Sequence, residues 1–321
     1  MKHRSTHGPG RSRGAVVVTG ASSGIGRACA LLLAAQGFRV FAGVRKERDG
    51  DALREAATGQ LTPLLVDVTD TASIAAARDT VARAVGAAGL VGLVNNAGVG
   101  MAGPLEYLPL AEARAAFEVN VLGVLATTQA FLPLLHQGRG RIVNIGSVGG
   151  KITLPFAGAL AASKHAVEAL TDALRQELHP WGLHVIVIEP GSIHTEAVDK
   201  VAQQGRTLAA ELTRGGHPWH GAALARFTQI MATRERGGSP PEVVAATVLR
   251  ALTAPRPSTR YPAGAHARLL LLLARALPDR PRDAVLLRLV KLPRRFGAAT
   301  RAHTVGVGVT SEHGGHYASV R

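Results

Sequence analysis

Short apolar runs alternate with longer amphipathic segments along most of the chain. Six of these runs are rich in apolar and β-branched residues and predict strands, at residues 15–19, 39–44, 61–68, 90–94, 141–145 and 183–189. Runs this short are typical of parallel strands that are buried on both faces. Helical spacing characterises the segments between them, at residues 27–36, 71–85, 111–135 and 155–178. The alternation of strand and helix predicts an α/β fold with a parallel sheet.

The basic charge of the chain lies at its two ends. Of the 321 residues, 46% are hydrophobic, enough for a sizeable core, and the formal net charge is +15. Residues 1–14 hold four Lys or Arg and no acid, and residues 256–321 hold twelve against three acids, which leaves +2 for residues 15–255. A nearly neutral body argues against a nucleic-acid groove in the main domain, so we expect no nucleic-acid partner.

Redox and targeting signals are sparse. Cys29 is the only cysteine, so no intrachain disulfide can form, which fits a reducing compartment. No apolar signal core follows the basic N-terminus, and the longest uninterrupted apolar runs are far shorter than the roughly 20 residues of a spanning helix. We therefore expect a cytoplasmic protein with no transmembrane segment.

A glycine-rich turn, T-G-A-S-S-G-I-G at Thr19–Gly26, joins the first predicted strand to the first helix. Glycines in this setting let the pyrophosphate of a dinucleotide approach the backbone and a helix N-terminus. Gly20, Gly24 and Gly26 are spaced differently from the commoner dinucleotide fingerprint. The turn nevertheless predicts a dinucleotide cofactor.

The end of the second predicted strand indicates which dinucleotide is bound. An enzyme that selects NAD places an acid there to hold the ribose 2′-hydroxyl, but this chain has Val44, followed by Arg45 and Lys46. A pair of cations would attract a 2′-phosphate, which favours NADP over NAD. The alternative is that both are ordinary exposed loop cations, muted by Glu47 and Asp49.

Further motifs follow the later strands. They are Asp67-Val68 after the third strand, N-N-A-G at Asn95–Gly98 after the fourth, Ser147 after the fifth, A-S-K ending at Lys164, and P-G-S-I-H-T at Pro190–Thr195 after the sixth. Asn120 lies in the middle of a predicted helix, where asparagine is a poor helix former. In this order and spacing the motifs resemble the short-chain dehydrogenase/reductase family over residues 14 to about 255. The stretch Pro155–Leu170 is further similar to the hydroxysteroid and retinol dehydrogenase branch.

The resemblance implies a doubly wound (Rossmann) parallel sheet of about seven strands, with the seventh near Arg260 and Tyr261. It implies hydride transfer between NADP(H) and a small-molecule carbonyl or alcohol, which we expect to be apolar, in a homo-oligomeric enzyme. In the family, the aspartate of the third strand contacts adenine, and the last loop supports the nicotinamide carboxamide. The cofactor-binding residues carried over are Gly20, Ser22, Ser23, Gly24, Ile25, Gly26, Arg45, Asp67, Val68, Asn95, Ala97, Gly98, Lys164, Pro190, Gly191, Ile193 and Thr195.

The resemblance also implies catalytic roles, and one position departs from the family. Ser147 would stabilise the developing oxyanion, Asn120 would order a water for proton relay, and Lys164 would lower the pKa of a tyrosine one helical turn earlier. That position is Leu160. A shift of register does not restore the tyrosine, because the residues four positions after Tyr107, Tyr261 and Tyr317 are Ala111, Ala265 and Arg321.

Leucine has no transferable proton, and loss of a positioned general acid costs about 10²- to 10⁴-fold in rate. Three readings follow. The chain is an impaired NADP-dependent oxidoreductase that uses water, Ser147 or a lid group as the donor, or it is a non-catalytic NADP(H)-binding sensor or scaffold. The third reading is that Leu160 is a substitution in an otherwise competent enzyme.

The domain plan places a basic disordered arm at residues 1–13, the main domain at 14–262 and a disordered tail at 297–321. Residues 196–238 are irregular in pattern and would form a substrate lid, and Ser239–Glu242 reads as a capping box that starts a helix. Residues 263–296 form a helical extension with leucine-rich basic helices, which pack on the domain, cap the site or contact a membrane surface. No metal site is expected, since His194, His217 and His220 are isolated.

Overall fold

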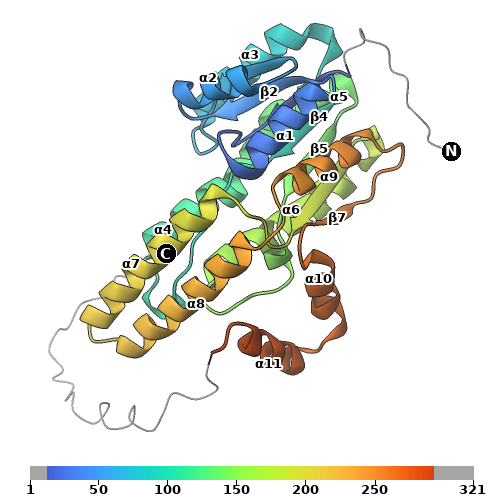
Figure 1. Ribbon diagram of the computed structural model, residues 1–321. Helices are drawn as coiled ribbons and strands as arrows, with labels where there is room; N and C mark the ends of the chain where they lie inside the picture. Colours follow the sequence, from blue (N-terminus) through green and yellow to red (C-terminus); the bar gives the residue numbers. More distant parts are fainter. Residues whose placement is uncertain (1–12, 293–321) are drawn as a thin grey trace, which may run out of the picture.

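The sheet has seven strands, all parallel, in the spatial order β3-β2-β1-β4-β5-β6-β7 (Figure 1). The computed structural model describes residues 13–292. The strands are β1 Ala15–Val18, β2 Arg39–Val44, β3 Leu61–Leu65, β4 Gly92–Asn95, β5 Arg141–Ile145, β6 His184–Pro190 and β7 Arg260–Ala263. The predicted doubly wound parallel sheet is confirmed, although the third strand ends at Leu65, before Asp67.

Helices cover both faces of the sheet, and each face has its own apolar core. The helices are α1 Gly24–Ala35, α2 Glu47–Ala56, α3 Thr71–Val85, α4 Leu110–Phe117, α5 Gly123–Gly138, α6 Gly158–Leu178, α7 Glu196–Arg214, α8 Pro218–Arg236, α9 Glu242–Thr253, α10 Ala267–Ala276 and α11 Asp279–Leu289. Leu33 of α1 and Val248 of α9 are buried in one core. Ile74 of α3, Phe131 of α5 and Leu178 of α6 are buried in the other.

Strand β1 lies between β2 and β4, so the chain winds away from β1 in both directions. In open α/β sheets, ligands bind outside the carboxyl ends of the strands at such a switch point. The glycine turn follows β1, and residues 95–98 follow β4. The topology therefore brings these two segments to the same edge of the sheet.

The helix predicted over residues 111–135 is three consecutive pieces. A π-helical turn at Glu118–Leu122 separates α4 from α5. Residues 110–138 form the one described helical run that is long and apolar enough, by length and composition, to cross a membrane. No such run was expected from the sequence. Phe131 and Leu135 of this run are buried against the sheet, as expected for a core helix of the fold.

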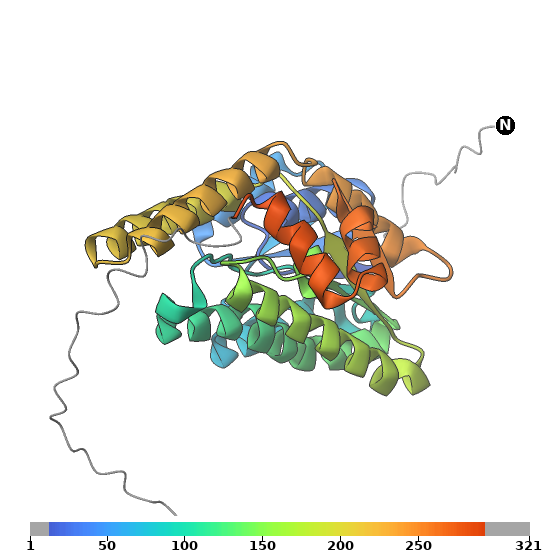
Figure 2. The ribbon, with the colours of Figure 1, turned by 90° about the horizontal axis from the view of Figure 1, so that it is seen from below.

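Residues 196–238 are not irregular but form two helices, α7 and α8, which project from the sheet as an antiparallel hairpin (Figures 1 and 2). The small residues that broke the helical pattern lie where the two helices touch. A Cβ on Gly205 would be 2.6 Å from Thr228 Oγ1, and one on Gly221 would be 2.1 Å from Thr213 Oγ1. Glycine is needed at these positions because the two helices pack closely. Glycine is also a poor helix former, so these residues obscured the helical pattern in the sequence.

The predicted capping box at residues 239–242 is wrong. Pro241 precedes the first residue of α9 and no side chain caps the helix. Ser239 instead donates its N–H to the Ser192 carbonyl oxygen, and its own carbonyl oxygen accepts from His194 N–H. The residue thus ties the chain before α9 to the loop after β6.

The predicted C-terminal helical extension is present as α10 and α11. Val290, directly after α11, is buried in an apolar cluster with Leu224 and Phe227 of α8. Arg234 Nη2 also donates to the Leu289 carbonyl oxygen at 2.8 Å. The predicted basic arm, except Arg13, and the predicted tail at 297–321 lie outside the described residues, as do residues 293–296 of the extension.

We predict that Gly205→Val will loosen the α7–α8 hairpin without unfolding the domain. The new side chain would collide with Thr228, and overpacking of this kind typically costs about 1 to 3 kcal/mol. Hydrogen exchange should rise in residues 196–236 and stay unchanged in the sheet. Gln204→Val, at an exposed neighbour on the same helix, is the matched control. Unchanged exchange in Gly205→Val would contradict the close packing.

Candidate active site

The glycine turn after β1 is shaped by contact with the loop after β4. Gly20 has φ 63°, and a Cβ there would be 2.7 Å from Ala97 Cα. Gly26 is equally restricted, because its Cβ would be 2.2 Å from the Gly20 carbonyl oxygen. Ser22 is exposed, and Ser23 and Ile25 are half-buried in the same turn. The glycines of the turn have no side chain, so a pyrophosphate could approach the backbone at these positions.

Thr19 and Asn96 fasten these two loops together, and neither was among the predicted site residues. Thr19 Oγ1 accepts hydrogen bonds from the N–H groups of Asn96 and Ala97, both at 3.0 Å. Asn96 Nδ2 donates to the carbonyl oxygens of Thr19 and Gly20, also at 3.0 Å. The two adjacent asparagines of N-N-A-G were the sequence feature that could have indicated these contacts. Asn96 bonds to the glycine turn, and Asn95 bonds within the core.

Asn95 is the residue that serves the core. It is buried, and its Nδ2 donates to Thr128 Oγ1 at 3.0 Å and to Asn144 Oδ1 at 2.9 Å. Asn144 Nδ2 in turn donates to Thr171 Oγ1 at 2.9 Å. This chain of amides and hydroxyls links β4 and β5 to α5 and α6. Buried amides need such partners, because an unpaired one costs about 1 to 3 kcal/mol.

Asn120 lies in the π-helical turn and its side chain bonds to two other segments. Its Oδ1 accepts from Val99 N–H at 2.8 Å, and its Nδ2 donates to the Val99 carbonyl oxygen at 3.0 Å and to Ser163 Oγ at 3.1 Å. Ser163 Oγ donates to the Leu160 carbonyl oxygen at 2.8 Å. Asn120 therefore couples the loop after β4 to the first turns of α6. π-turns of this kind are frequent at functional sites.

Lys164 and Ser147 meet at the end of β5. Lys164 Nζ donates to the Ile145 carbonyl oxygen at 2.9 Å, two residues before Ser147. Ser147 Oγ accepts from Gly149 N–H at 2.9 Å, which fixes the serine at the start of a short 3₁₀ turn. A Cβ on Gly98 would be 3.2 Å from Asn120 Oδ1 and 4.0 Å from Lys164 Nζ. The structure thus places Gly98, Asn120, Ser147 and Lys164 in one region.

Desolvation lowers the pKa of Lys164 to about 8. The folded chain therefore binds fewer protons than the unfolded chain between about pH 8 and 10.5, so this group's contribution to stability rises with pH in that window. Leu160 lies one helical turn before Lys164, in the first turn of α6, and is half-buried. Its side chain carries no hydrogen-bonding group.

The loop after β6 reaches back to the glycine turn. A Cβ on Gly24 would be 3.2 Å from Thr195 Cγ2. A cavity of about 240 Å³ lies beside this contact, and Arg27, His194 and Thr195 are among its lining residues. Pro190 and Gly191 hold the start of the loop against β7, since Gly191 N–H donates to the Ala263 carbonyl oxygen at 2.9 Å.

Glu235 of α8 is a third residue that the sequence did not indicate, after Thr19 and Asn96. Its Oε2 accepts from Ile193 N–H at 3.0 Å, which fastens α8 to the loop after β6. Burial raises the pKa of Glu235, while the hydrogen bond from Ile193 opposes the rise.

Arg45 directly follows β2, and Asp67 and Val68 follow β3. In the sheet these two strands lie on the other side of β1 from β5, whose end precedes Ser147. Arg45 is exposed, and no side chain among the described residues ion-pairs with it. Hydrogen bonds from the N–H and hydroxyl of Thr69 lower the pKa of Asp67, and the charge of Arg45 adds to this effect. Val68 is buried against Gly123.

The residues present fit a dinucleotide. A side chain at the glycines of the turn or at Gly98 would occupy the space that a dinucleotide needs. These glycines follow β1 and β4, which are neighbours in the sheet. Arg45 offers an exposed cation where the adenosine ribose would lie, at the end of β2. Lys164 and Ser147 lie beyond Gly98, where the nicotinamide end would reach.

Comparisons with known proteins agree with this geometry. The family model described as short chain dehydrogenase matches residues 14–206. The chain belongs to this short-chain dehydrogenase/reductase family. It is 36% identical over 278 residues to "NADPH-dependent 3-dehydrocapnine reductase" of Ornithobacterium rhinotracheale, covering 84% of this chain and 94% of that protein. It is 38% identical over 277 residues to "Retinol dehydrogenase 5" of Mus musculus, covering 84% and 87%.

Solved structures of other short-chain dehydrogenases match most of the chain. One from Streptomyces avermitilis has 28% identity and a TM-score of 0.67, covering 87% of this chain and 96% of that one. One from Burkholderia cenocepacia J2315, in complex with NADP, has 28% identity and a TM-score of 0.62, covering 87% and 98%. The chain is thus a short-chain dehydrogenase/reductase over nearly all of its described length.

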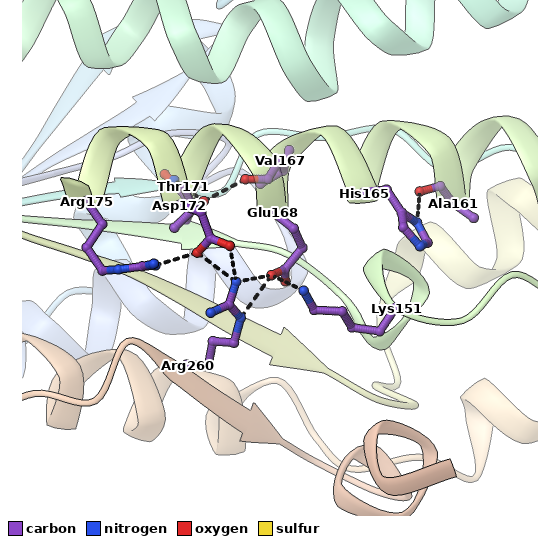
Figure 3. Close-up of polar contacts among 10 residues, drawn as sticks. Lys151, Ala161, His165, Val167, Glu168, Thr171, Asp172, Arg175 and Arg260 are labelled. Carbon is purple, nitrogen blue, oxygen red and sulfur yellow. Dashed lines mark hydrogen bonds and ion pairs between the residues drawn. The ribbon is translucent and has the colours of Figure 1, made fainter. Parts of the chain in front are cut away.

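This short-chain dehydrogenase/reductase anchors α6 through a partly buried ion cluster on the side facing β7 (Figure 3). Glu168, one turn after Lys164, is 4% exposed. Its Oε2 lies 2.8 Å from Lys151 Nζ and 3.0 Å from Arg260 Nη2. Arg260 also donates to both oxygens of Asp172, at 2.7 and 2.8 Å, and Arg175 pairs with Asp172. The cluster joins β7 to two turns of the helix that carries Leu160 and Lys164.

One carboxylate oxygen of Glu168, Oε1, is buried and has no hydrogen-bond partner among the described residues. The carboxyl of Glu189 in β6 is close enough to feel the charge of Glu168. Burial, followed by that negative charge, raises the pKa of Glu189 to about 7. Lys151 and Arg260 oppose the rise. At neutral pH Glu189 is therefore protonated for part of the time.

We predict that Glu189→Gln will remove a pH-dependent loss of stability. The folded chain binds more protons than the unfolded chain between about pH 4.5 and 7, so this group's contribution is intact below 4.5 and is lost as pH rises through 7. A glutamine amide in place of the Glu189 carboxyl does not ionise. The unfolding midpoint in denaturant, measured from pH 4.5 to 8.5, should fall less steeply in the variant. Glu55→Gln, at an exposed site, is the control, and an unchanged slope in Glu189→Gln would contradict the raised pKa of Glu189.

Proposed function

We propose that this chain is an NADP(H)-dependent oxidoreductase of carbonyl or alcohol substrates whose turnover is limited by the absence of a built-in proton donor. The observation that carries the proposal is Leu160, one helical turn before Lys164 in an otherwise complete site. The glycine turn, Gly98 and Lys164 support cofactor binding, and the short-chain dehydrogenase/reductase family as a whole uses NAD(P).

Arg45 supports NADP over NAD. It directly follows β2, where an enzyme that selects NAD has a carboxylate. The positive charge of Arg45 would instead attract a ribose 2′-phosphate. The relative named as an NADPH-dependent reductase and the related structure in complex with NADP point the same way. Glu47 and Asp49, in the first turn of α2, carry negative charges close to Arg45 in the chain, which would weaken its preference for NADP.

When bound, the nicotinamide supplies or accepts a hydride at its C4. The protein's own contribution is to hold the substrate oxygen and to move a proton. Ser147 Oγ, fixed by Gly149 N–H, is placed to donate a hydrogen bond to that oxygen. Lys164, with a pKa lowered to about 8, would bind the ribose and supply positive charge, but it has no phenol to act through. Proton delivery then falls to water, Ser147 or a lid group.

Apolar side chains from the lid support an apolar substrate. Leu154 and Phe156, in the loop before α6, lie in the same cluster as Leu208, Phe227 and Met231 of the lid helices. The rings of Phe156 and Phe227 are 5.5 Å apart between centroids in an edge-on arrangement. Residues 196–238 are proposed as the lid on this basis. The domain limits 14–262, the homo-oligomeric state and the cytoplasmic location stay predictions.

Leu160 also favours a second candidate function, a non-catalytic NADP(H)-binding sensor or scaffold. The hydrogen bonds that hold the cofactor loops do not involve the Leu160 side chain, so binding can persist without turnover. The two candidates differ in whether turnover can be detected and whether a tyrosine restores it.

We predict that Leu160→Tyr will raise turnover on a panel of carbonyl substrates by about a hundredfold, because a positioned general acid contributes about 10² to 10⁴. NADPH affinity, titrated by fluorescence, should stay the same. Leu160→Phe, which adds the ring without the hydroxyl, is the control and should gain nothing. Wild-type turnover as fast as that of Leu160→Tyr would show that another donor exists. No turnover in any of the proteins, with NADPH still bound, would favour the sensor or scaffold.

We predict that Arg45→Gln will weaken NADPH binding by about tenfold and leave NADH binding unchanged, because it removes one charge-assisted contact with the 2′-phosphate. Fluorescence titration of both nucleotides measures this. Arg48→Gln, an exposed cation on α2, serves as the control. Equal loss for both nucleotides would mean that Arg45 does not select between them.

A further inference from the structure

Helix α10 turns two leucines toward solvent. Leu269 is 55% exposed and Leu272 is 61% exposed, and a spacing of three residues puts them on one face of the helix. Arg268 and Arg275 are also exposed, and the helix contains no acid. At about 100° per residue, both arginines lie along the same edge of the pair of leucines. The remaining leucines of α10 are only partly exposed, so the outer face is a narrow apolar strip with arginines along one edge.

The strip continues into a groove between α9, β7 and α10. This groove has a volume of about 570 Å³, and Val243, Leu269, Arg250, His266 and Arg268 are among its lining residues. Val243 is itself 38% exposed. The face thus combines apolar side chains with several cations over three elements rather than on one helix alone.

The net charge of this region is basic. Residues 256–292 hold eight Lys or Arg and two acids, Asp279 and Asp283, whereas residues 15–255 carry only +2. An apolar strip beside basic side chains matches the interface of an anionic bilayer, which attracts basic residues near its surface. A second protein would have to supply both an apolar ridge and a surplus of acids, and this chain's own body is nearly neutral.

We propose that α10 docks on an anionic lipid bilayer, with Leu269 and Leu272 in the interface and Arg268 and Arg275 against the headgroups. The position of α10 gives this docking a consequence for the site. The chain runs from α10 directly into α11, and Val290 at the end of α11 packs on α8 of the lid. Figure 2 shows α10 and α11 together beside the sheet, with the lid hairpin extending from the same side of the molecule. A docked molecule would hold its lid near the membrane surface, where apolar carbonyl compounds partition.

The test is sedimentation of the full chain with vesicles of phosphatidylcholine alone and of phosphatidylcholine mixed with phosphatidylglycerol. We expect binding to the anionic vesicles only, weakened by salt. The double variant Leu269→Ser/Leu272→Ser should bind at least fivefold less. Leu65→Ser, at an exposed leucine on the opposite edge strand β3, should bind like wild type. Arg268→Gln/Arg275→Gln should also weaken binding, whereas Arg48→Gln/Arg54→Gln on α2 should do so much less.

Hydrogen exchange of the same full chain supplies an independent readout. We expect residues 267–276 to gain protection when anionic vesicles are added. Protection of these residues without vesicles would show that a second copy or another segment of the chain already covers them, and would overturn the proposal. Equal binding to neutral vesicles, or undiminished binding by the leucine double variant, would overturn it as well. Neither readout requires turnover or NADPH, so the result is independent of the oxidoreductase proposal.

Discussion

The hydrogen bonds between the loop after β1 and the loop after β4 are the constraint on which the rest of the site depends. Thr19 Oγ1 accepts from two successive N–H groups, and Asn96 returns two donors to the glycine turn. Because β1 and β4 are neighbours at the switch point, these bonds fix the crevice where a dinucleotide can lie. The glycines are a consequence of this closeness, since Gly20 has no room for a side chain against Ala97. The glycine backbone that a phosphate could approach is thus a result of the close contact between the loops after β1 and β4.

Helix α6 organises the other half of the site. Leu160, Lys164 and Glu168 occupy successive turns of one face, so the helix presents the leucine, the lysine and the anchoring carboxylate in a row. Glu168 is held by Lys151 and Arg260, and Lys164 by the carbonyl of Ile145. None of these contacts uses the side chain at position 160. The hydrogen bonds and ion pairs around Lys164 and Glu168 therefore do not require a polar side chain at position 160.

The sequence predicted most of the fold and the outline of the site, because both are encoded locally. Buried strands, glycine turns and Lys164 one turn after Leu160 each leave a signal within a few residues. The α7–α8 hairpin did not, since glycines such as Gly205 lower helix propensity while serving contacts made only in the folded hairpin. Thr19, Asn96 and Glu235 were missed for a related reason: their roles come from partners 42 or more residues away. The capping box at Ser239 failed because the serine's backbone bonds to the loop after β6 instead.

The π-helical turn at Glu118–Leu122 lets the chain hold one extra residue without disturbing the helix that follows. A π-turn holds one residue more than an α-turn, so the widened turn absorbs that residue locally. Loss of a single residue here would convert the turn to α-helix and leave Phe131 and Leu135 of α5 against the sheet. It would withdraw Asn120 from Val99 and Ser163. A one-residue deletion at this point would therefore damage the site while sparing the core.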